Sequence, residues 1–481
     1  MNGRIRGRLK VVIADVLLTA ATLILVSTGA GAQALPAPQS GRVELQVSFS
    51  KLLAVFDFLR QVSPRARDNP LKTLFANSAY ANGRLGTLAA AIDSIPLDYQ
   101  FPFSQYPKGL KIEGSTLSLL SRNLVAASSP TDFRLRSIGI IPMADLNRLV
   151  ALLEEFTPVY DTLVYEPNRA TFERQLREIT SLIASKNVAD DFEHSRAFFR
   201  ASWDPAIPFV FVFHPRPNAR GFRATAYGNI GEWPLSTSLT EYGTTLTLLL
   251  HETAHILLDE QPLAFKRELS GWFDSSPARS AGYARALMQE AWATAVGNGY
   301  FREKLLGSLS TGSWYGLKYP DQMAKAFYPY VKPYLEAGRP MNKALVDAYL
   351  NLFETQFIGW LSEWEHLLMG RMVLAERQSD IDAIDRKYPF RADGLDLREF
   401  SPATLRQVRE SSMTKVIVVA RDNRRTLDLV RAELPALAKW RPSAGRDFVY
   451  SVLGDDKQRL IVINLVKDAI DRHLGAVLGR P

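Results

Sequence analysis

Two histidines four residues apart give the clearest chemical signal in the sequence. The segment Leu248–Leu257, LLLHETAHIL, carries His251, Glu252 and His255 in the spacing HExxH. Residues four apart project from one face of an α-helix about one turn, roughly 6 Å, apart, so both imidazoles can reach one Zn²⁺ at about 2 Å. Glu252 would lie beside the metal without binding it and could take a proton from metal-bound water. The spacing therefore predicts hydrolysis of an amide or a similar acyl bond.

The surroundings of this motif favour a metal site over a chance match. The neighbouring positions are uncharged, the stretch from Glu241 to Asp259 contains no proline and is expected to be a helix, and the motif uses two of only six histidines in 481 residues. A bare HExxH also arises by chance, and a buried histidine satisfied by core hydrogen bonds is the ordinary alternative.

The segment resembles the zinc metallopeptidases called zincins. Their extended motif asks for uncharged residues around HExxH and a hydrophobic residue two positions after the second histidine. The residues at these positions here are Thr253, Ala254, Ile256 and Leu257. A metzincin would have Gly and His three and six residues after His255, where this chain has Leu258 and Gln261. The resemblance is therefore to the gluzincin branch and covers about 100 residues, from the strand at 207 to the helix ending near 301.

In gluzincins the third metal ligand is a glutamate on a later helix. Glu290 lies 35 residues after His255, in a helix expected over 284–301. The resemblance implies one Zn²⁺ per chain, bound by His251, His255 and Glu290 with water at the fourth position. A carboxylate in this apolar, small-residue surround would be costly unless it were paired or metal-bound. Asp259 or Glu260 would be the alternative third ligand.

The resemblance also suggests residues around the ligands. Gluzincins often have an Asp four residues after the third ligand that orients a zinc histidine, and here Thr294 stands there. Asp259, four residues after His255, could take over that role, although a solvated helix end is its ordinary interpretation. Tyr315 and Tyr319 are the candidates for stabilising the transition state, with packing as the alternative for any of the 17 tyrosines.

Two more histidines and a predicted edge strand complete the surroundings of the motif. We expect structural roles for His214, at a strand end before Pro215, and for His366, on what looks like a helix surface. Zincins hold the extended substrate backbone on an antiparallel edge strand, and the segment 223–229 precedes the metal helix at a suitable distance.

The pattern of the whole chain predicts an α+β fold. We expect a mixed amino-terminal region over 43–140, a mostly helical, zincin-like (thermolysin-like) domain with a small sheet over 141–400, and a small α/β unit over 412–481. The amino-terminal region should begin with a strand at 43–49 and a helix at 52–62. The apolar run 207–213 should be a strand buried on both faces. The last unit should hold a strand at 415–420, a helix at 426–437, two strands joined at 454–456 and a final helix.

Net charge and cysteine content limit the classes of molecule and metal site that the chain can be expected to have. Of the formal net charge of +8, a net +3 lies in the first 32 residues, and no long basic run interleaved with aromatics follows, which disfavours nucleic-acid binding. The chain has no cysteine, so a transition metal must be held by histidines and carboxylates. We expect a peptide or protein substrate, and the sequence leaves the oligomeric state open.

Two other functions stay open at this point. One is a binding or scaffold protein that keeps a zincin shell without catalysis; the intact Glu252 argues against it, because a structural zinc site has no use for that carboxylate. The other is a zinc hydrolase acting on a non-peptide substrate, which the sequence does not separate from a peptidase.

The amino terminus predicts export. Four basic residues precede an apolar stretch over 16–26, and Ala30-Gly31-Ala32 has the small-residue pattern of a cleavage site. We expect residues 1–32 to be a signal peptide and 33–42 a disordered stub, with a periplasmic or secreted mature chain that has no stable membrane insertion. Amino-terminal sequencing of exported protein should give Gln33 or Leu35; an intact Met1 on membrane-bound protein would contradict this.

Overall fold

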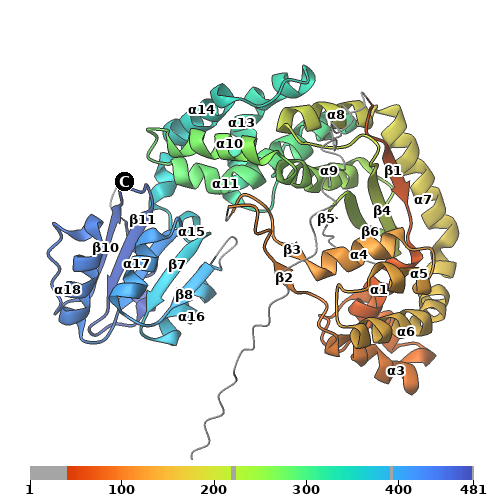
Figure 1. Ribbon diagram of the computed structural model, residues 1–481, viewed down its shortest axis with the longest axis horizontal. Helices are drawn as coiled ribbons and strands as arrows, with labels where there is room; N and C mark the ends of the chain where they lie inside the picture. The colour runs from red at the N-terminus through yellow and green to blue at the C-terminus, as the bar shows by residue number, and fades with distance from the viewer. Residues whose placement is uncertain (1–40, 108, 218–223, 390–393, 479–481) are drawn as a thin grey trace, which may run out of the picture. The chain divides into compact units, whose positions relative to one another are not determined.

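The computed structural model describes residues 41–107, 109–217, 224–389 and 394–478 (Figure 1). The expected signal peptide lies outside these residues. The chain is an α+β protein in which helices predominate over small mixed sheets. Within the described ranges, no helix is both long and apolar enough to cross a bilayer.

The first sheet has the strand order β1-β4-β6-β5. Its strands are β1 (Leu45–Ser48), β4 (Phe209–Arg216), β6 (Ile230–Ser236) and β5 (Thr225–Tyr227). The strands β1, β4 and β6 run parallel, and β5 pairs antiparallel with β6 at the edge. The apolar run predicted at 207–213 is confirmed as a buried strand from Phe209 onward, whereas Ile207 precedes the strand and is exposed. Phe211 and Phe213 enter one core, and Val212 enters the other.

Helices from the amino-terminal third cover the Val212 face of this sheet. They are α1 (Lys51–Val62), α2 (Pro70–Ala76), α3 (Arg84–Ala89), α4 (Thr116–Ala126), α5 (Pro130–Arg136) and α6 (Met143–Tyr160), with a small hairpin of β2 (Gln100–Phe101) and β3 (Gly114–Ser115). The helix expected at 52–62 is confirmed, and Ser50 caps it by accepting the Leu53 N–H at 3.2 Å.

The opposite face of the sheet packs against the helix that carries the HExxH motif. This helix, α9 (Gly243–Asp259), follows the predicted bounds closely and contributes Leu246, Leu249 and Leu250 to the larger core. The other α-helices between residues 166 and 367 are α7 (Glu166–Ser185), α8 (Val188–Phe199), α10 (Leu263–Asp274), α11 (Ala281–Thr294), α12 (Arg302–Leu306), α13 (Lys318–Glu336), α14 (Lys343–Leu352) and α15 (Trp364–Leu367).

The helix expected over 284–301 changes its winding partway. After α11 the backbone continues as a π-helical segment, η4 (Ala295–Phe301), in which every residue is buried. A second π-helical segment, η3 (Asp161–Tyr165), joins α6 to α7. Such segments are rare and occur frequently at functional sites.

The second sheet has the order β10-β11-β9-β7-β8. Its strands are β7 (Arg371–Ala375), β8 (Gly394–Leu397), β9 (Thr414–Val419), β10 (Phe448–Leu453) and β11 (Arg459–Asn464), with helices α16 (Gln378–Lys387), α17 (Pro402–Glu410) and α18 (Asn423–Glu433). The expected unit boundary at 412 therefore falls inside a sheet, because the short β7 and β8 extend it before that residue. The predicted final helix is only a short 3₁₀ turn at Ile470–Arg472.

A row of charged and polar side chains lies on the Val212 face of the first sheet. Arg216 donates to Asp57 of α1 at 2.5 Å, and the same carboxylate oxygen lies 3.3 Å from His214 Nε2. His214 Nδ1 is 3.9 Å from Glu232, which accepts the Tyr227 hydroxyl at 2.8 Å. His214 therefore has a structural role, as expected. It lies in this row of side chains and is covered by the amino-terminal helices.

Burial shifts two of these groups in opposite directions. Burial and the nearby Asp57 carboxylate raise the pKa of Glu232 to about 7. Burial lowers the pKa of His214 to about 4, against the attraction of Asp57. Glu232 therefore favours the fold most at low pH, whereas His214 favours it most at high pH.

We predict that Glu232→Gln changes how stability depends on pH. The ordinary pKa of Glu232 is 4.5 and its folded value about 7, so its stabilising contribution is complete below pH 4.5 and is lost as pH rises through 7. Gln keeps an acceptor for Tyr227 and does not ionise. The free energy of unfolding, measured in urea, should therefore rise in the variant relative to wild type by roughly 1–3 kcal/mol between pH 5 and 8, at about 1.4 kcal/mol per pKa unit.

Glu178→Gln is the matched control, because that carboxylate also accepts a tyrosine hydroxyl, from Tyr242 at 2.6 Å, but is half exposed. A stability difference between wild type and Glu232→Gln that stayed constant from pH 5 to 8 would contradict the prediction.

Candidate metal centre

Helix α9 presents both histidines of the motif on one side. Its first turn is capped by the Glu241 carboxylate, which accepts the N–H groups of Gly243 and Thr244. The two imidazoles meet edge to face, and their Nε2 atoms are 3.2 Å apart. The His251 side chain is 5% exposed and that of His255 is 17% exposed. Both imidazoles therefore reach one point, as the HExxH spacing predicts.

Helix α11 brings Glu290 to the same point. Its Oε2 atom lies 3.6 Å from each histidine Nε2. These three side chains form one of the two groups in the described chain that could hold a metal ion. Glu290 Oε2 is buried and accepts no hydrogen bond, although the side chain as a whole is 39% exposed. The three expected ligands are thus brought together with one face toward solvent.

Glu290 and His255 each stabilise the charged form of the other. Burial raises the pKa of Glu290, but His251, His255 and a hydrogen bond from the Tyr315 side chain outweigh it and hold that pKa well below its usual range. Burial lowers the pKa of His255, but the carboxylates of Glu290 and Glu252 outweigh it and raise that pKa. Glu290 is therefore an anion at neutral pH, as a metal ligand must be.

Glu252 lies next to the three-residue group without belonging to it. Its side chain is half-buried, and it is close enough to His255 to raise the pKa of that ring. Its expected role, accepting a proton from metal-bound water, stays a prediction.

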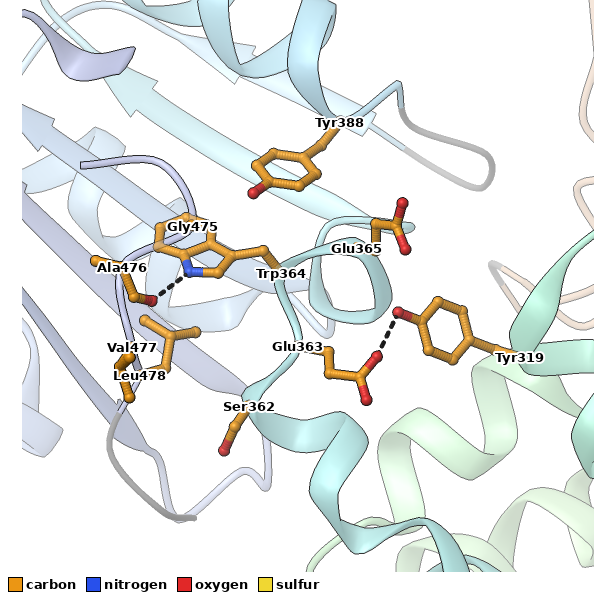
Figure 2. A pocket seen from close by; sticks show the side chains of 10 residues that line it. All are labelled: Tyr319, Ser362, Glu363, Trp364, Glu365, Tyr388, Gly475, Ala476, Val477 and Leu478. Carbon is orange, nitrogen blue, oxygen red and sulfur yellow. Dashed lines mark hydrogen bonds between the residues drawn. The ribbon is translucent and has the colours of Figure 1, made fainter. Parts of the chain in front are cut away.

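The two candidate tyrosines have different surroundings. The Tyr315 ring stacks on His251 with centroids 5.5 Å apart and 20° between planes, and its side chain hydrogen-bonds Glu290. Tyr319 instead donates to Glu363 at 2.9 Å and lines a different pocket with Trp364 and Tyr388 (Figure 2). The structure thus brings Tyr315 to the site, whereas the assignment of Tyr319 is corrected: helix α13 directs it to the Glu363 segment.

Neither expected supporting residue hydrogen-bonds a ligand histidine. Asp259 pairs with Lys111 at 2.7 Å and Lys266 at 3.3 Å and accepts the Ile112 N–H at 2.9 Å, so it is neither a solvated helix end nor a partner of His255. These cations neutralise it where the segment before β3 docks on the end of α9. Thr294 is fully buried, and its hydroxyl has no hydrogen-bond partner.

The sequence did not reveal the role of Gly297. A side-chain Cβ at this position of η4 would lie 2.5 Å from the Cα and 2.6 Å from the Cβ of His251. Only glycine permits so close an approach of η4 to α9. Two glycines, Gly297 and Gly299, inside an apolar helical pattern were the signal that could have pointed to it.

His366 is buried rather than on a surface. Its ring contacts Tyr283, Tyr319 and Trp360, its Nδ1 lies 3.2 Å from the Trp360 carbonyl, and burial lowers its pKa to about 4. The structural role expected for it stands, but the expected surface location is wrong, because its short helix packs into an aromatic cluster.

The other described group with metal-ligand spacing is Asp447, Asp468 and His473. Asp447 already accepts the backbone N–H groups of Val466, Lys467 and Asp468, and Asp468 pairs with Arg472 at 2.5 Å. The carboxylates of this second group are therefore already held by backbone N–H groups and Arg472, whereas Glu290 Oε2 faces the two histidines.

An edge strand lies beside the metal helix. Among the described residues β5 pairs only with β6, and it packs against α9. It covers Thr225–Tyr227 of the segment expected at 223–229, of which Arg223 lies outside the described residues.

Comparison with protein-family models, with curated proteins and with solved structures gives no match for this chain.

Proposed function

We propose that this chain is an exported zinc-dependent metallohydrolase with a zincin-like, gluzincin-type catalytic domain, and that it hydrolyses peptide bonds. One observation carries the proposal. Donors about 2.0–2.1 Å from a tetrahedral ion lie about 3.3–3.4 Å from one another. The separations among His251 Nε2, His255 Nε2 and Glu290 Oε2 are 3.2, 3.6 and 3.6 Å, so the three atoms surround one point at zinc-binding distance.

The donor set fits zinc rather than a harder ion. Two neutral imidazoles and one carboxylate are a common ligand set of catalytic zinc sites, which leave a coordination position open. The exposed side of Glu290 leaves that position accessible from solvent. A bound Zn²⁺ would lower the pKa of its water ligand to about 7 and polarise the scissile carbonyl.

The residues around the ligands have separate roles. Glu252 accepts a proton from the attacking water and delivers it to the leaving nitrogen. Tyr315 has its phenol beside Glu290 and stacked on His251, where it donates to the oxygen on which negative charge develops. The antiparallel edge strand β5 favours a peptide as the substrate, because an extended peptide can hydrogen-bond to an unpaired strand edge.

One prediction from the proposed function concerns the third ligand. Glu290→Ala should weaken zinc binding by more than about a hundredfold, since even partners outside the ligand shell are typically worth about 10–100-fold. The measurement is zinc affinity by competition with a chelator, together with thermal unfolding to show that the fold is retained. Asp259→Asn is the control and should keep full zinc affinity, because that carboxylate is held by Lys111 and Lys266. The opposite result, with zinc lost in Asp259→Asn and kept in Glu290→Ala, would reassign the third ligand.

Another prediction separates an enzyme from a scaffold. Glu252→Gln should retain zinc, because Glu252 is no ligand, and should retain the helix, because Gln and Glu have similar helix propensities. Turnover of a peptide that the wild type cleaves should fall by about a hundredfold to ten-thousandfold, because the amide cannot accept the proton.

Zinc content and thermal stability of both forms complete this experiment. Full activity in the Gln variant would refute the mechanism. Activity lost together with zinc would mean that Glu252 supports the site instead of performing the chemistry.

A further inference from the structure

The position of Tyr315 depends on a segment without regular secondary structure. Residues 307–317 connect α12 to α13 and contain no helix or strand. A side chain on such a segment has no helix or strand to fix it. The neighbouring contacts must therefore determine whether the phenol stays over His251.

Asp321 holds the backbone on one side. It lies in the first turn of α13 and is 7% exposed. One of its oxygens, Oδ1, accepts the N–H of Trp314 at 2.5 Å and the N–H of Tyr315 at 3.1 Å, while Oδ2 pairs with Lys325 at 2.8 Å. Hydrogen bonds to an ionised acceptor are about twice as strong as neutral ones, so two consecutive amides are firmly fixed.

Asn298 holds the same backbone on the other side. It lies in η4, is 7% exposed, and donates from Nδ2 to the Trp314 carbonyl at 2.7 Å. The Trp314 indole donates to the Ser310 carbonyl at 3.0 Å and packs edge to face on Tyr328. Gly299 makes room for both rings, since a Cβ there would lie 2.9 Å from each.

The segment Gly297–Gly299 therefore touches both parts of the site. Gly297 lies against the backbone of His251, and Asn298, the next residue, binds the backbone that precedes Tyr315. Contacts with the same few residues of η4 therefore position both His251 and Tyr315. A shift of this segment would move both together.

We propose that Asp321 and Asn298 are positioning residues, which fix the Trp314–Tyr315 backbone so that the Tyr315 phenol stays over His251 and beside Glu290. This inference rests on the proposed function, because it assigns Tyr315 a role in the reaction. Asp321 and Asn298 act only through Tyr315 and touch neither metal nor substrate.

A double-mutant cycle tests this dependence. Tyr315→Phe and Asp321→Ala should each lower kcat by about tenfold or more, as expected for loss or misplacement of one transition-state donor, with KM changed less. In the Tyr315→Phe background, Asp321→Ala should cause no further loss of kcat, because its effect passes through the absent phenol. Asn298→Ala should behave in the same way. Asp321→Asn should restore kcat to within a few-fold of wild type, because the amide oxygen still accepts both N–H groups.

Asp380→Ala is the matched control for loss of a buried carboxylate. Asp380 is 4% exposed and pairs with Arg377 at 2.8 Å on α16, away from the Tyr315 segment. It should lower the unfolding temperature and leave kcat unchanged.

Two readouts do not depend on turnover. In zinc-free protein, the amide hydrogens of Trp314 and Tyr315 should exchange faster in Asp321→Ala than in wild type or in Asp321→Asn. In cobalt-substituted protein, Asp321→Ala and Tyr315→Phe should shift the visible spectrum alike, with no further shift in the double variant.

The outcomes separate this inference from the proposed function. If the wild type cleaves no peptide but the cobalt spectra follow the cycle, the proposed function fails and the positioning stands. Unchanged amide exchange in Asp321→Ala, or additive losses of kcat and additive spectral shifts, would overturn the positioning even in an active peptidase. A chain that binds neither zinc nor cobalt would overturn the proposed function, whereas faster amide exchange in Asp321→Ala would still support the positioning.

Discussion

The close contact between α9 and η4 at Gly297 is the constraint on which the site depends. His251 and Glu290 come from different helices, and their ligand atoms can meet only if the backbones of these helices approach closely. The absence of a side chain at Gly297 removes the steric barrier to that approach. Burying η4 completely then fixes the spacing, because a close-packed interior transmits small displacements to its neighbours.

The elements that carry the ligands could be predicted because their signals are local. Apolar periodicity and the lack of proline define α9, and the HExxH spacing alone places two imidazoles on one face. The buried strand β4 follows from its run of apolar residues. The prediction of Glu290 rests on a family resemblance and on the cost of an unpaired carboxylate among small residues, and the structure brings it to the histidines.

What could not be predicted depends on contacts between distant segments. No local sequence signal near Asp259 predicts its ion pair with Lys111, which lies 148 residues earlier in the chain. Tyr315 and Tyr319 differ by four positions, yet only the first lies on a segment that turns back to His251. The strands β7 and β8 are short, and they join a sheet whose other strands come later in the chain, so local pattern places the boundary too late.

The three side chains that could bind a metal differ in how much of their surface is exposed to solvent. The exposed fraction rises from 5% at His251 through 17% at His255 to 39% at Glu290, and Tyr315 covers the most buried ring. If a cation binds here, it would approach from the Glu290 side and would meet His251, which Tyr315 covers, last. Release would then run in the reverse order, so a chelator would first contact such an ion on the carboxylate side.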